Sequence, residues 1–326
     1  MQKTLAVVNL KNIRENAVAA RSLASGKKFY AVVKADAYGH GAEQVALALE
    51  DVVDGFCVAI VDEGIRLRVA GVTKPVLVFT PPLCKEDGVR AMFYSLTMSV
   101  SNIENAQFIR GCPYHLKVNT GMNRLGCDVS EIDKVILSAG KDNLEGVYSH
   151  MFCPENSAYS AAQLSLFKRA EERAKQVNSS IFAHFSASGG ILKGGEYLFD
   201  GVRCGIMLYG YTPEGFKFSK LKKALKVYAP LVQTTRFIGG GTGYTKAVKN
   251  YGKLNTYRCG YADGFLRTMR LGEGNLCMDT FVKEGGEKLL CVMDDAEKYA
   301  LKCGTISYEI LTRVTKRAQI IYERRT

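Results

Sequence analysis

The sequence has no apolar run long enough to cross a bilayer and no secretory leader pattern. A membrane-spanning helix needs about 20 largely apolar residues, and no run approaches that length. The N-terminus, MQKTLAVVNLKNIREN, lacks the apolar core and cleavage site of a signal peptide. We therefore expect a cytoplasmic protein without a membrane partner.

The sequence also lacks the cysteine spacings that are typical of metal sites and disulfide frameworks. The ten cysteines are scattered, no two form a C-x-x-C pair, and only four histidines accompany them. This pattern indicates neither a zinc site nor a disulfide framework. We expect no metal, and we interpret the cysteines as buried free thiols in a reducing compartment.

Acidic residues are outnumbered by basic ones, which gives a net charge of +12. One basic cluster consists of Lys217, Lys220, Lys222, Lys223 and Lys226. The other positive charges are spread along the chain, and neither a nucleic-acid motif nor interleaved aromatic residues accompany them. We expect no nucleic-acid partner, and we interpret the charge as a solvated basic surface that attracts anionic ligands.

Short β-rich apolar runs alternate with helical patterns in the first two thirds of the chain. Eight runs are expected to be strands: Phe29–Lys34, Gly55–Ile60, Val76–Thr80, Leu96–Val100, Tyr114–Asn119, Gly146–His150, Ile181–Ser186 and Val202–Leu208. This α/β pattern predicts a (β/α)8 TIM barrel, with a doubly wound open sheet as the competing fold. After residue 212, glycines punctuate short β-branched runs, which predicts a smaller all-β domain. We expect a barrel over residues 8–214 and a β-rich domain over residues 215–326, to which residues 1–7 can add.

A lysine follows directly after an apolar run in the stretch VVKADAYGH. Lysine is rarely buried without a partner, and a desolvated lysine loses its proton readily and can form a Schiff base. Taken alone, Lys34 could equally extend its ammonium group from a strand end into water. Polar residues also end or follow other expected strands: Asn119, His150, Ser188 and Arg203. Because the strand C-termini of such a barrel form its active site, we expect these side chains to converge.

Nine ordered blocks of the sequence resemble the bacterial alanine racemase family. They are VVKADAYGHG, HLKVNTGMNRLG, EGVYSH, HFSAS, VRCGIMLYG, the pair Gly243-Tyr244, GYADGFLR, CMDT and TISY. The blocks follow the family's order and reach both ends of the chain. The resemblance implies an isomerase that interconverts L- and D-alanine with pyridoxal 5'-phosphate and supplies D-alanine for peptidoglycan in the cell wall.

The resemblance also implies which residues hold the cofactor. Lys34 would bind it as a Schiff base, and Arg203, with His150 beside it, would face the pyridine nitrogen. Tyr38, Ser188 and Tyr308 would bind the phosphate through hydroxyl groups, and Gly205 and Ile206 through backbone N–H groups. A dianionic phosphate needs several such donors. Because arginine only donates, the ring nitrogen would stay unprotonated and be a weaker electron sink, which discourages transamination.

Racemisation removes a proton from one face of the α-carbon and returns one to the other face. Two bases on opposite faces do this without moving. The resemblance implies that Lys34 is one base and that Tyr244, from the other subunit of a head-to-tail homodimer, is the second. Since an ordinary tyrosine has a pKa of about 10, nearby positive charge must favour its phenolate.

The remaining site residues also come from the resemblance. Arg124 and the backbone of Met278 would contact the substrate carboxylate, while Tyr261 and Asp279 would lie near the entrance. Lys117 matches a lysine that family members often carry as a carbamate. A carbamate would turn a contact between two cations into a salt bridge.

Three positions depart from the family pattern. Asn119 stands where aspartate is usual, Asn123 replaces a glycine, and Ala187 replaces an asparagine. The first change removes a negative charge near Arg124, and the second domain is shorter than usual. A racemase that prefers serine or accepts several amino acids therefore stays an alternative, although Tyr308 favours alanine. A non-catalytic pyridoxal-phosphate carrier is a further alternative, which the second-domain blocks disfavour.

Overall fold

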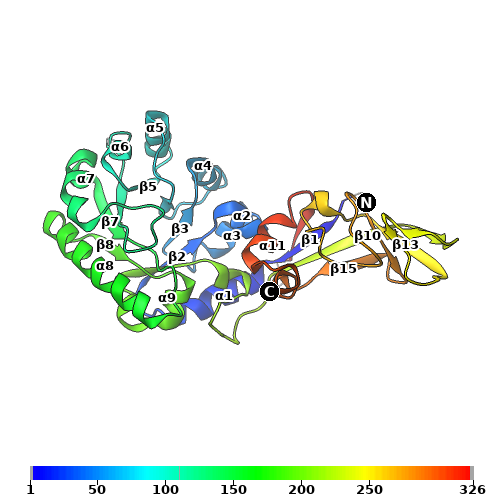
Figure 1. The fold of residues 1–326 in the computed structure, drawn as a ribbon. Coiled ribbons are helices and arrows are strands. Elements are labelled where there is room, and N and C mark those ends of the chain that lie inside the picture. Colours follow the sequence, from blue (N-terminus) through cyan, green and yellow to red (C-terminus); the bar gives the residue numbers. More distant parts are fainter. Residues whose placement is uncertain (1–2, 110, 324–326) are drawn as a thin grey trace. The chain divides into compact units, whose positions relative to one another are not determined.

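The computed structural model describes residues 3–109 and 111–323, which cluster into two compact units (Figure 1). The first, the barrel unit, comprises Arg14–Ala37 and Ala42–Leu221. The second, the β unit, comprises the described residues up to Ile13, Tyr38–Gly41, and the described residues from Lys222 onward. Each unit has its own sheet and is described by itself.

Eight parallel strands form a closed barrel in the barrel unit (Figure 1). They are β2 (Lys28–Val32), β3 (Gly55–Val58), β4 (Val76–Val78), β5 (Thr97–Val100), β6 (Tyr114–Lys117), β7 (Leu144–Tyr148), β8 (Phe182–His184) and β9 (Gly201–Cys204). The last strand, β9, pairs with the first, β2. The TIM-barrel prediction is confirmed, and the open-sheet alternative is wrong.

Helices alternate with these strands, as a parallel barrel requires. The helices are α1 (Leu10–Ser22), α3 (Ala42–Leu49), α4 (Val61–Val69), α5 (Lys85–Phe93), α6 (Ile103–Ala106), α7 (Ile132–Ala139), α8 (Ser157–Val177) and α9 (Ser188–Lys193). Short 3-10 turns are η1 (Val129–Glu131), η2 (Lys141–Asn143), η3 (Gly195–Tyr197) and η4 (Ile206–Tyr209). Helix α7 shows why they form: its apolar residues recur at helical spacing, and that face is buried.

Aromatic rings fill the barrel interior. A ring atom of Phe182 lies 2.5 Å from where a Cβ on Gly201 would stand, so this strand position has no room for a side chain. The rings stack in series with centroid separations of 5.3, 4.7 and 4.8 Å, in the order Tyr30, Phe182, His184 and Tyr148. The interior is therefore a packed core, which leaves the chemistry to the strand ends.

Every barrel strand except β5 ends at least two residues earlier than predicted, and two of these ends, those of β2 and β9, shape the candidate site. β2 stops at Val32, not at Lys34, because the chain turns into a positive-φ conformation directly after the lysine. β9 stops at Cys204, and the 3-10 turn η4 replaces the strand that was predicted to reach Leu208. There Gly205 adopts φ −114° and ψ −95°, which lies outside the β region. Both turns bring candidate cofactor ligands out of the sheet.

The turn α2 (Lys34–Gly39) is left-handed. Its residues with φ between 52° and 54° are Ala35, Asp36, Ala37 and Tyr38. This conformation costs L-residues roughly 1–2 kcal/mol each. Carboxylates offset part of the cost: Glu63 accepts from the Ala35 N–H at 2.8 Å, and Asp36 accepts from the Ala42 N–H at 2.9 Å. The strained turn fixes the backbone that carries Lys34.

The β unit contains a sheet with the strand order β14-β13-β10-β1-β16, and β15 also pairs with β10. Its strands are β1 (Leu5–Asn9), β10 (Leu225–Arg236), β13 (Lys253–Tyr257), β14 (Phe281–Glu284), β15 (Leu289–Met293) and β16 (Gln319–Glu323). A separate hairpin joins β11 (Gly241–Thr242) to β12 (Thr245–Lys246). The 3-10 turn η5 (Tyr261–Asp263) and the helices α10 (Ala296–Cys303) and α11 (Ser307–Arg313) complete the unit.

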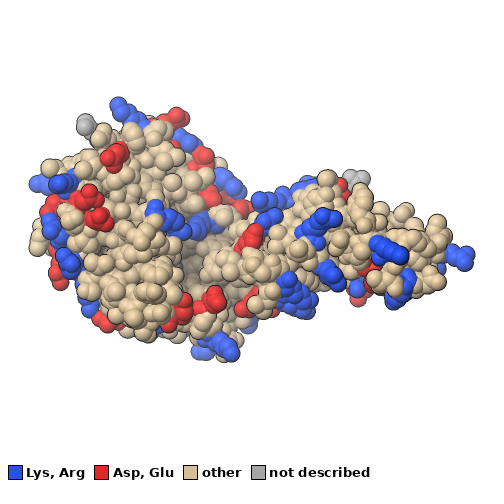
Figure 2. All heavy atoms as spheres, in the orientation of Figure 1, with Lys and Arg blue, Asp and Glu red and all other residues tan. Residues whose placement is uncertain are grey.

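Charged side chains of both signs are scattered over the face of the molecule that Figure 2 shows, with Lys and Arg interspersed with Asp and Glu. In the described part of the chain, no helix is both long enough and apolar enough to cross a membrane.

All ten cysteines are free thiols. The buried ones are Cys57, Cys112, Cys127, Cys204 and Cys259. The expectation of burial was wrong for Cys84, which directly precedes α5, and for Cys291 on β15, because both side chains are exposed.

Candidate active site

Cationic side chains gather where the barrel strands end. Lys34 follows β2, Lys117 ends β6, and Arg203 lies near the end of β9. Arg124 comes from the loop after β6. All four lower the pKa of the half-buried His150 imidazole, after the larger effect of desolvation itself. Lys34, His150 and Arg203, three of the side chains that were expected to converge, therefore lie within electrostatic reach of one another.

Lys34 is a half-buried amine without a hydrogen-bonding partner among the described residues. Its Nζ lies 5.8 Å from the centroid of the Phe79 ring. Burial lowers the pKa of Lys34, and Arg124 lowers it further, whereas the carboxylate of Glu63 opposes the shift. An amine that deprotonates easily is suited to act as a nucleophile or a base.

Arg203 is only 2% exposed, yet one of its donors is unused. One terminal nitrogen donates to Nδ1 of His184 at 2.6 Å and to the His184 carbonyl at 2.9 Å. The other donates to the carbonyls of Ser149 at 2.7 Å and Phe185 at 3.0 Å. Of the five N–H donors of a guanidinium, only Nε–H makes no hydrogen bond within the described chain. That donor is left for a group that enters the barrel.

The predicted phosphate ligands form one set in each unit. In the barrel unit, the Gly205 N–H donates to Ser188 Oγ at 3.1 Å, and the Ile206 N–H has no partner among the described residues. Because Ile206 begins η4, this unpaired donor lies at the start of a helical turn, where anions bind. In the β unit, the ring centroids of Tyr38 and Tyr308 lie 5.9 Å apart.

Lys117 is a second such amine, and it is buried. It is 9% exposed, and its Nζ lies 4.4 Å from the centroid of the Tyr148 ring. It forms no ion pair or hydrogen bond with any residue that the structure describes. Burial, followed by Arg203 and Arg124, holds the pKa of Lys117 well below its usual value. Lys117 therefore loses its proton more easily than an exposed lysine does.

The loop before Arg124 explains two departures from the family pattern. Asn119 Oδ1 accepts from the Gly121 and Asn123 N–H groups at 3.1 Å each, and Asn119 Nδ2 donates to Asn123 Oδ1 at 3.0 Å. Asn123 has φ 56°, a conformation that asparagine tolerates better than most residues. The two asparagines therefore hold the turn without adding a charge next to Arg124.

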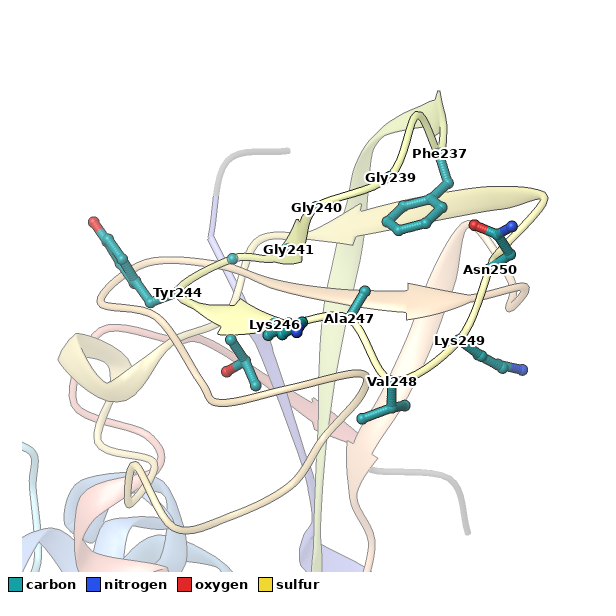
Figure 3. Close-up of a pocket in the computed structure, with 12 residues that line it drawn as sticks. Phe237, Gly239, Gly240, Gly241, Tyr244, Lys246, Ala247, Val248, Lys249 and Asn250 are labelled. Carbon is teal, nitrogen blue, oxygen red and sulfur yellow. The ribbon is translucent and has the colours of Figure 1, made fainter.

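Tyr244 stands at the tip of the hairpin between β11 and β12, and it is one of twelve residues between Phe237 and Asn250 that line an open hollow of about 630 Å³. Its side chain points away from the other labelled side chains (Figure 3) and is 88% exposed. A phenol that packs so little against its own unit is available to a second molecule.

Two loops of the β unit are joined by backbone hydrogen bonds. Tyr261 donates to the Cys277 carbonyl at 3.0 Å, and Ala262 donates to the Met278 carbonyl at 2.9 Å. The Met278 N–H makes no hydrogen bond within the described residues. Asp279 pairs with Arg317 at 3.0 Å. These bonds fix the Met278 backbone, and its N–H group can donate to a ligand.

Sequence reasoning missed the groups that support these side chains. His184 and His115 lie in the blocks HFSAS and HLKVN, but neither was singled out as part of the site. Arg317 contacts both Asp279 and the buried Asp263, and nothing in the sequence linked them. A histidine inside a predicted buried strand, Ile181–Ser186, was the available signal for His184.

Comparisons with known proteins agree with these observations. The model of the alanine racemase N-terminal domain matches residues 8–213. The alanine racemase of Carboxydothermus hydrogenoformans is 33% identical and covers 99% of this chain and 100% of its own. That of Streptococcus uberis is 32% identical and covers 96% of each chain.

Solved structures show the same similarity. The alanine racemase of Clostridium difficile 630 in complex with cycloserine has a TM-score of 0.86 at 27% identity, over 98% of this chain and 95% of its own. The alanine racemase of Bartonella henselae with covalently bound pyridoxal phosphate has a TM-score of 0.81 at 25% identity, over 98% of this chain and 99% of its own. The chain belongs to the alanine racemase family.

Proposed function

We propose that this protein is a pyridoxal-phosphate-dependent alanine racemase, an isomerase that interconverts L- and D-alanine and supplies D-alanine for peptidoglycan. The observation that carries the proposal is the pair formed by a deprotonation-prone Lys34 and a buried Arg203 with one unused donor. Relatives named alanine racemase align with nearly the whole chain. This alignment supports assigning the candidate residues of both units to one racemase reaction.

The donors in the two units fit pyridoxal phosphate. Lys34 would hold it covalently, and Arg203 Nε–H, with His150 nearby, would meet the pyridine nitrogen. Its phosphate would be bound by Tyr38, Ser188, Gly205, Ile206 and Tyr308. When bound, the cofactor withdraws electrons and so acidifies the α-proton of the amino acid. Assigning the barrel to residues 8–214 and the domain with the second base to residues 215–326 belongs to this proposal.

Lys34 and Tyr244 of the partner subunit would serve as the two bases. Lys34 exchanges a proton on one face of the α-carbon, and the phenol exchanges one on the other. The exposure of Tyr244 on its own unit supports a contribution across a head-to-tail homodimer. Arg124 and the Met278 N–H would hold the substrate carboxylate, and Tyr261 and Asp279 would border the entrance.

Lys117 would be carried as a carbamate. Its burial, its lowered pKa and the absence of a partner within the described chain make the neutral amine available for reaction with carbon dioxide. The resulting anion would pair with Arg124 and replace the charge that Asn119 lacks. A cationic Lys117 in the mature enzyme would contradict this assignment.

Alanine is preferred over the alternative substrates and over a carrier role. Tyr308 is retained and lies against Tyr38, which favours a narrow pocket and a small side chain. The exposed Tyr244 hairpin and the Met278 loop have no use in a protein that only carries the cofactor.

The purified protein tests the proposal. We expect the visible absorption band of lysine-bound pyridoxal phosphate, together with conversion of L-alanine to D-alanine. Lys34→Ala should abolish both, whereas Lys168→Ala, at a surface ion pair on α8, should change neither. A wild-type protein without the band would refute the proposal. A band without turnover would support the carrier instead, and faster turnover of serine would support the broader racemase.

A further inference from the structure

Two buried histidines extend from Arg203 into the barrel core. His184 is 1% exposed and accepts from Arg203 through Nδ1 at 2.6 Å. Its Nε2 lies 2.8 Å from Nδ1 of His115, which is 4% exposed. The three residues come from β9, β8 and β6, so three strands are joined by a single run of side-chain hydrogen bonds.

The chemistry of arginine sets the proton on each ring. A guanidinium has donors only, so the Nδ1 that faces Arg203 must be unprotonated. The proton of a neutral His184 is then on Nε2, where it donates to Nδ1 of His115. His115 must therefore carry its own proton on Nε2. Burial next to cations keeps both rings neutral, and it lowers the pKa of His115 to about 3.

The ring of His184 is also held on its faces. It stacks on Tyr148 with a centroid distance of 4.8 Å and an interplanar angle of 3°, and on Phe182 at 4.7 Å and 17°. The Tyr148 hydroxyl is fixed in turn by Ser99 at 2.6 Å, and Ser99 donates to the Val78 carbonyl at 2.6 Å. Rotation of the imidazole would break the stacks as well as the hydrogen bonds.

We infer that His184 and His115 are a positioning pair for Arg203, with both protons on Nε2, that holds the guanidinium so that its Nε–H stays free for the ring nitrogen of the cofactor. Apart from the His184 ring, the contacts that the structure gives to the terminal nitrogens of Arg203 are backbone carbonyls. The His184–His115 pair is thus the part of this hydrogen-bond network in which side chains orient the guanidinium. The identity of the Nε acceptor rests on the proposed function; the two tautomers do not.

The tautomers can be measured directly in the holoenzyme. Long-range ¹H–¹⁵N correlation spectra distinguish Nδ1–H from Nε2–H, and with only four histidines in the chain, single substitutions suffice for assignment. We expect neutral Nε2–H forms for both His184 and His115 at neutral pH. A proton on Nδ1 of His184, or a doubly protonated ring, would overturn the inference.

A matched pair of variants at His115 tests the positioning role, because this residue bonds His184 and not Arg203. His115→Asn keeps an acceptor near the position of Nδ1, whereas His115→Leu has a similar size and no acceptor. The leucine variant should shift the visible band of the bound cofactor and lower kcat about tenfold with little change in KM, since it leaves a buried donor unpaired. The asparagine variant should stay close to wild type.

Two results separate positioning from general damage. Equal behaviour of both folded variants, judged by their thermal unfolding midpoints, would show that the acceptor at His115 is irrelevant and would refute the pair's role. If His115→Leu does not fold, the tautomers of His184 and His115 measured in the wild-type protein still test the inference. A missing visible band in the wild type would contradict the proposed function alone, because the tautomers are read without reference to turnover.

Discussion

At the scale of single residues, the barrel end is defined by cations whose acidic partners are few. Lys117 is buried and Lys34 is half-buried, and Arg203 and Arg124 add positive charge, while Glu63 is the carboxylate that acts on Lys34. Such a cluster costs stability until anionic ligands arrive. The same desolvation lowers the pKa of both lysines, so each amine loses its proton more easily than an exposed lysine does.

Tyr244→Phe should separate the two faces of the α-carbon. Phenylalanine keeps the ring and removes the hydroxyl that would abstract the proton from L-alanine. In D₂O, we expect α-proton exchange of L-alanine to slow by about 10²–10⁴-fold, while D-alanine still exchanges through Lys34. Proton NMR of the unreacted amino acid measures both rates.

The matched control is Tyr159→Phe on α8, a tyrosine that is 53% exposed. It should leave both exchange rates unchanged. Equal slowing for L- and D-alanine in Tyr244→Phe would argue against assigning each base to one face.

At the scale of elements, the left-handed turn α2 conflicts with the local preferences of its residues. Two of its strained residues are alanines, which favour right-handed helix. The conformation persists because Glu63 and Asp36 satisfy backbone donors around the turn. Strain of this kind collects at functional sites, where the surrounding structure imposes the backbone. Here it directly follows Lys34.

Ala35→Gly should raise the free energy of unfolding by about 0.5–1 kcal/mol. Glycine adopts positive φ freely, and the gain of roughly 1–2 kcal/mol exceeds the extra backbone entropy that glycine loses on folding. Ala35 is exposed, so removing its methyl group leaves no cavity. Denaturant unfolding measures the change.

Ala162→Gly is the control, because Ala162 is an exposed alanine inside the right-handed helix α8. This substitution should lower stability by about 1 kcal/mol. If both variants were destabilised alike, the left-handed turn would carry no strain at position 35.

At the scale of the whole molecule, the proposed active site needs two chains. Lys34→Ala and Tyr244→Phe should each be nearly inactive alone. In a mixed dimer, one of the two sites combines the intact Lys34 of one chain with the intact Tyr244 of the other. The isolated mixed dimer should therefore show about half of wild-type activity, and a random mixture, in which half of the dimers are mixed, about a quarter.

Co-expression of two differently tagged variants, followed by tandem purification, isolates the mixed dimer for this assay. Co-expression of Lys34→Ala with wild type gives the reference for a dimer with one inactive lysine. If the mixed dimer of the two variants showed no recovery, Tyr244 would act within its own chain.

The barrel could be predicted because its signals are local. Strands such as Val76–Val78 are continuous apolar runs, and helices such as α7 show a 3.6-residue period, so the order of elements follows from neighbours in the chain. Strand ends were less predictable. Lys34 and Leu208 were assigned to strands because their local patterns continue the sheet, whereas tertiary contacts turn the backbone away.

By itself, the sequence determined the element order, the polar residues at the strand ends and, through its ordered blocks, the family. Only the tertiary structure decided which donor of Arg203 is unused, because the other four bond atoms of Ser149, His184 and Phe185. It also decided that His115, 69 residues from His184, fixes that ring's proton. Hydrogen bonds between strands depend on barrel closure, and no local pattern records which side chains closure brings together.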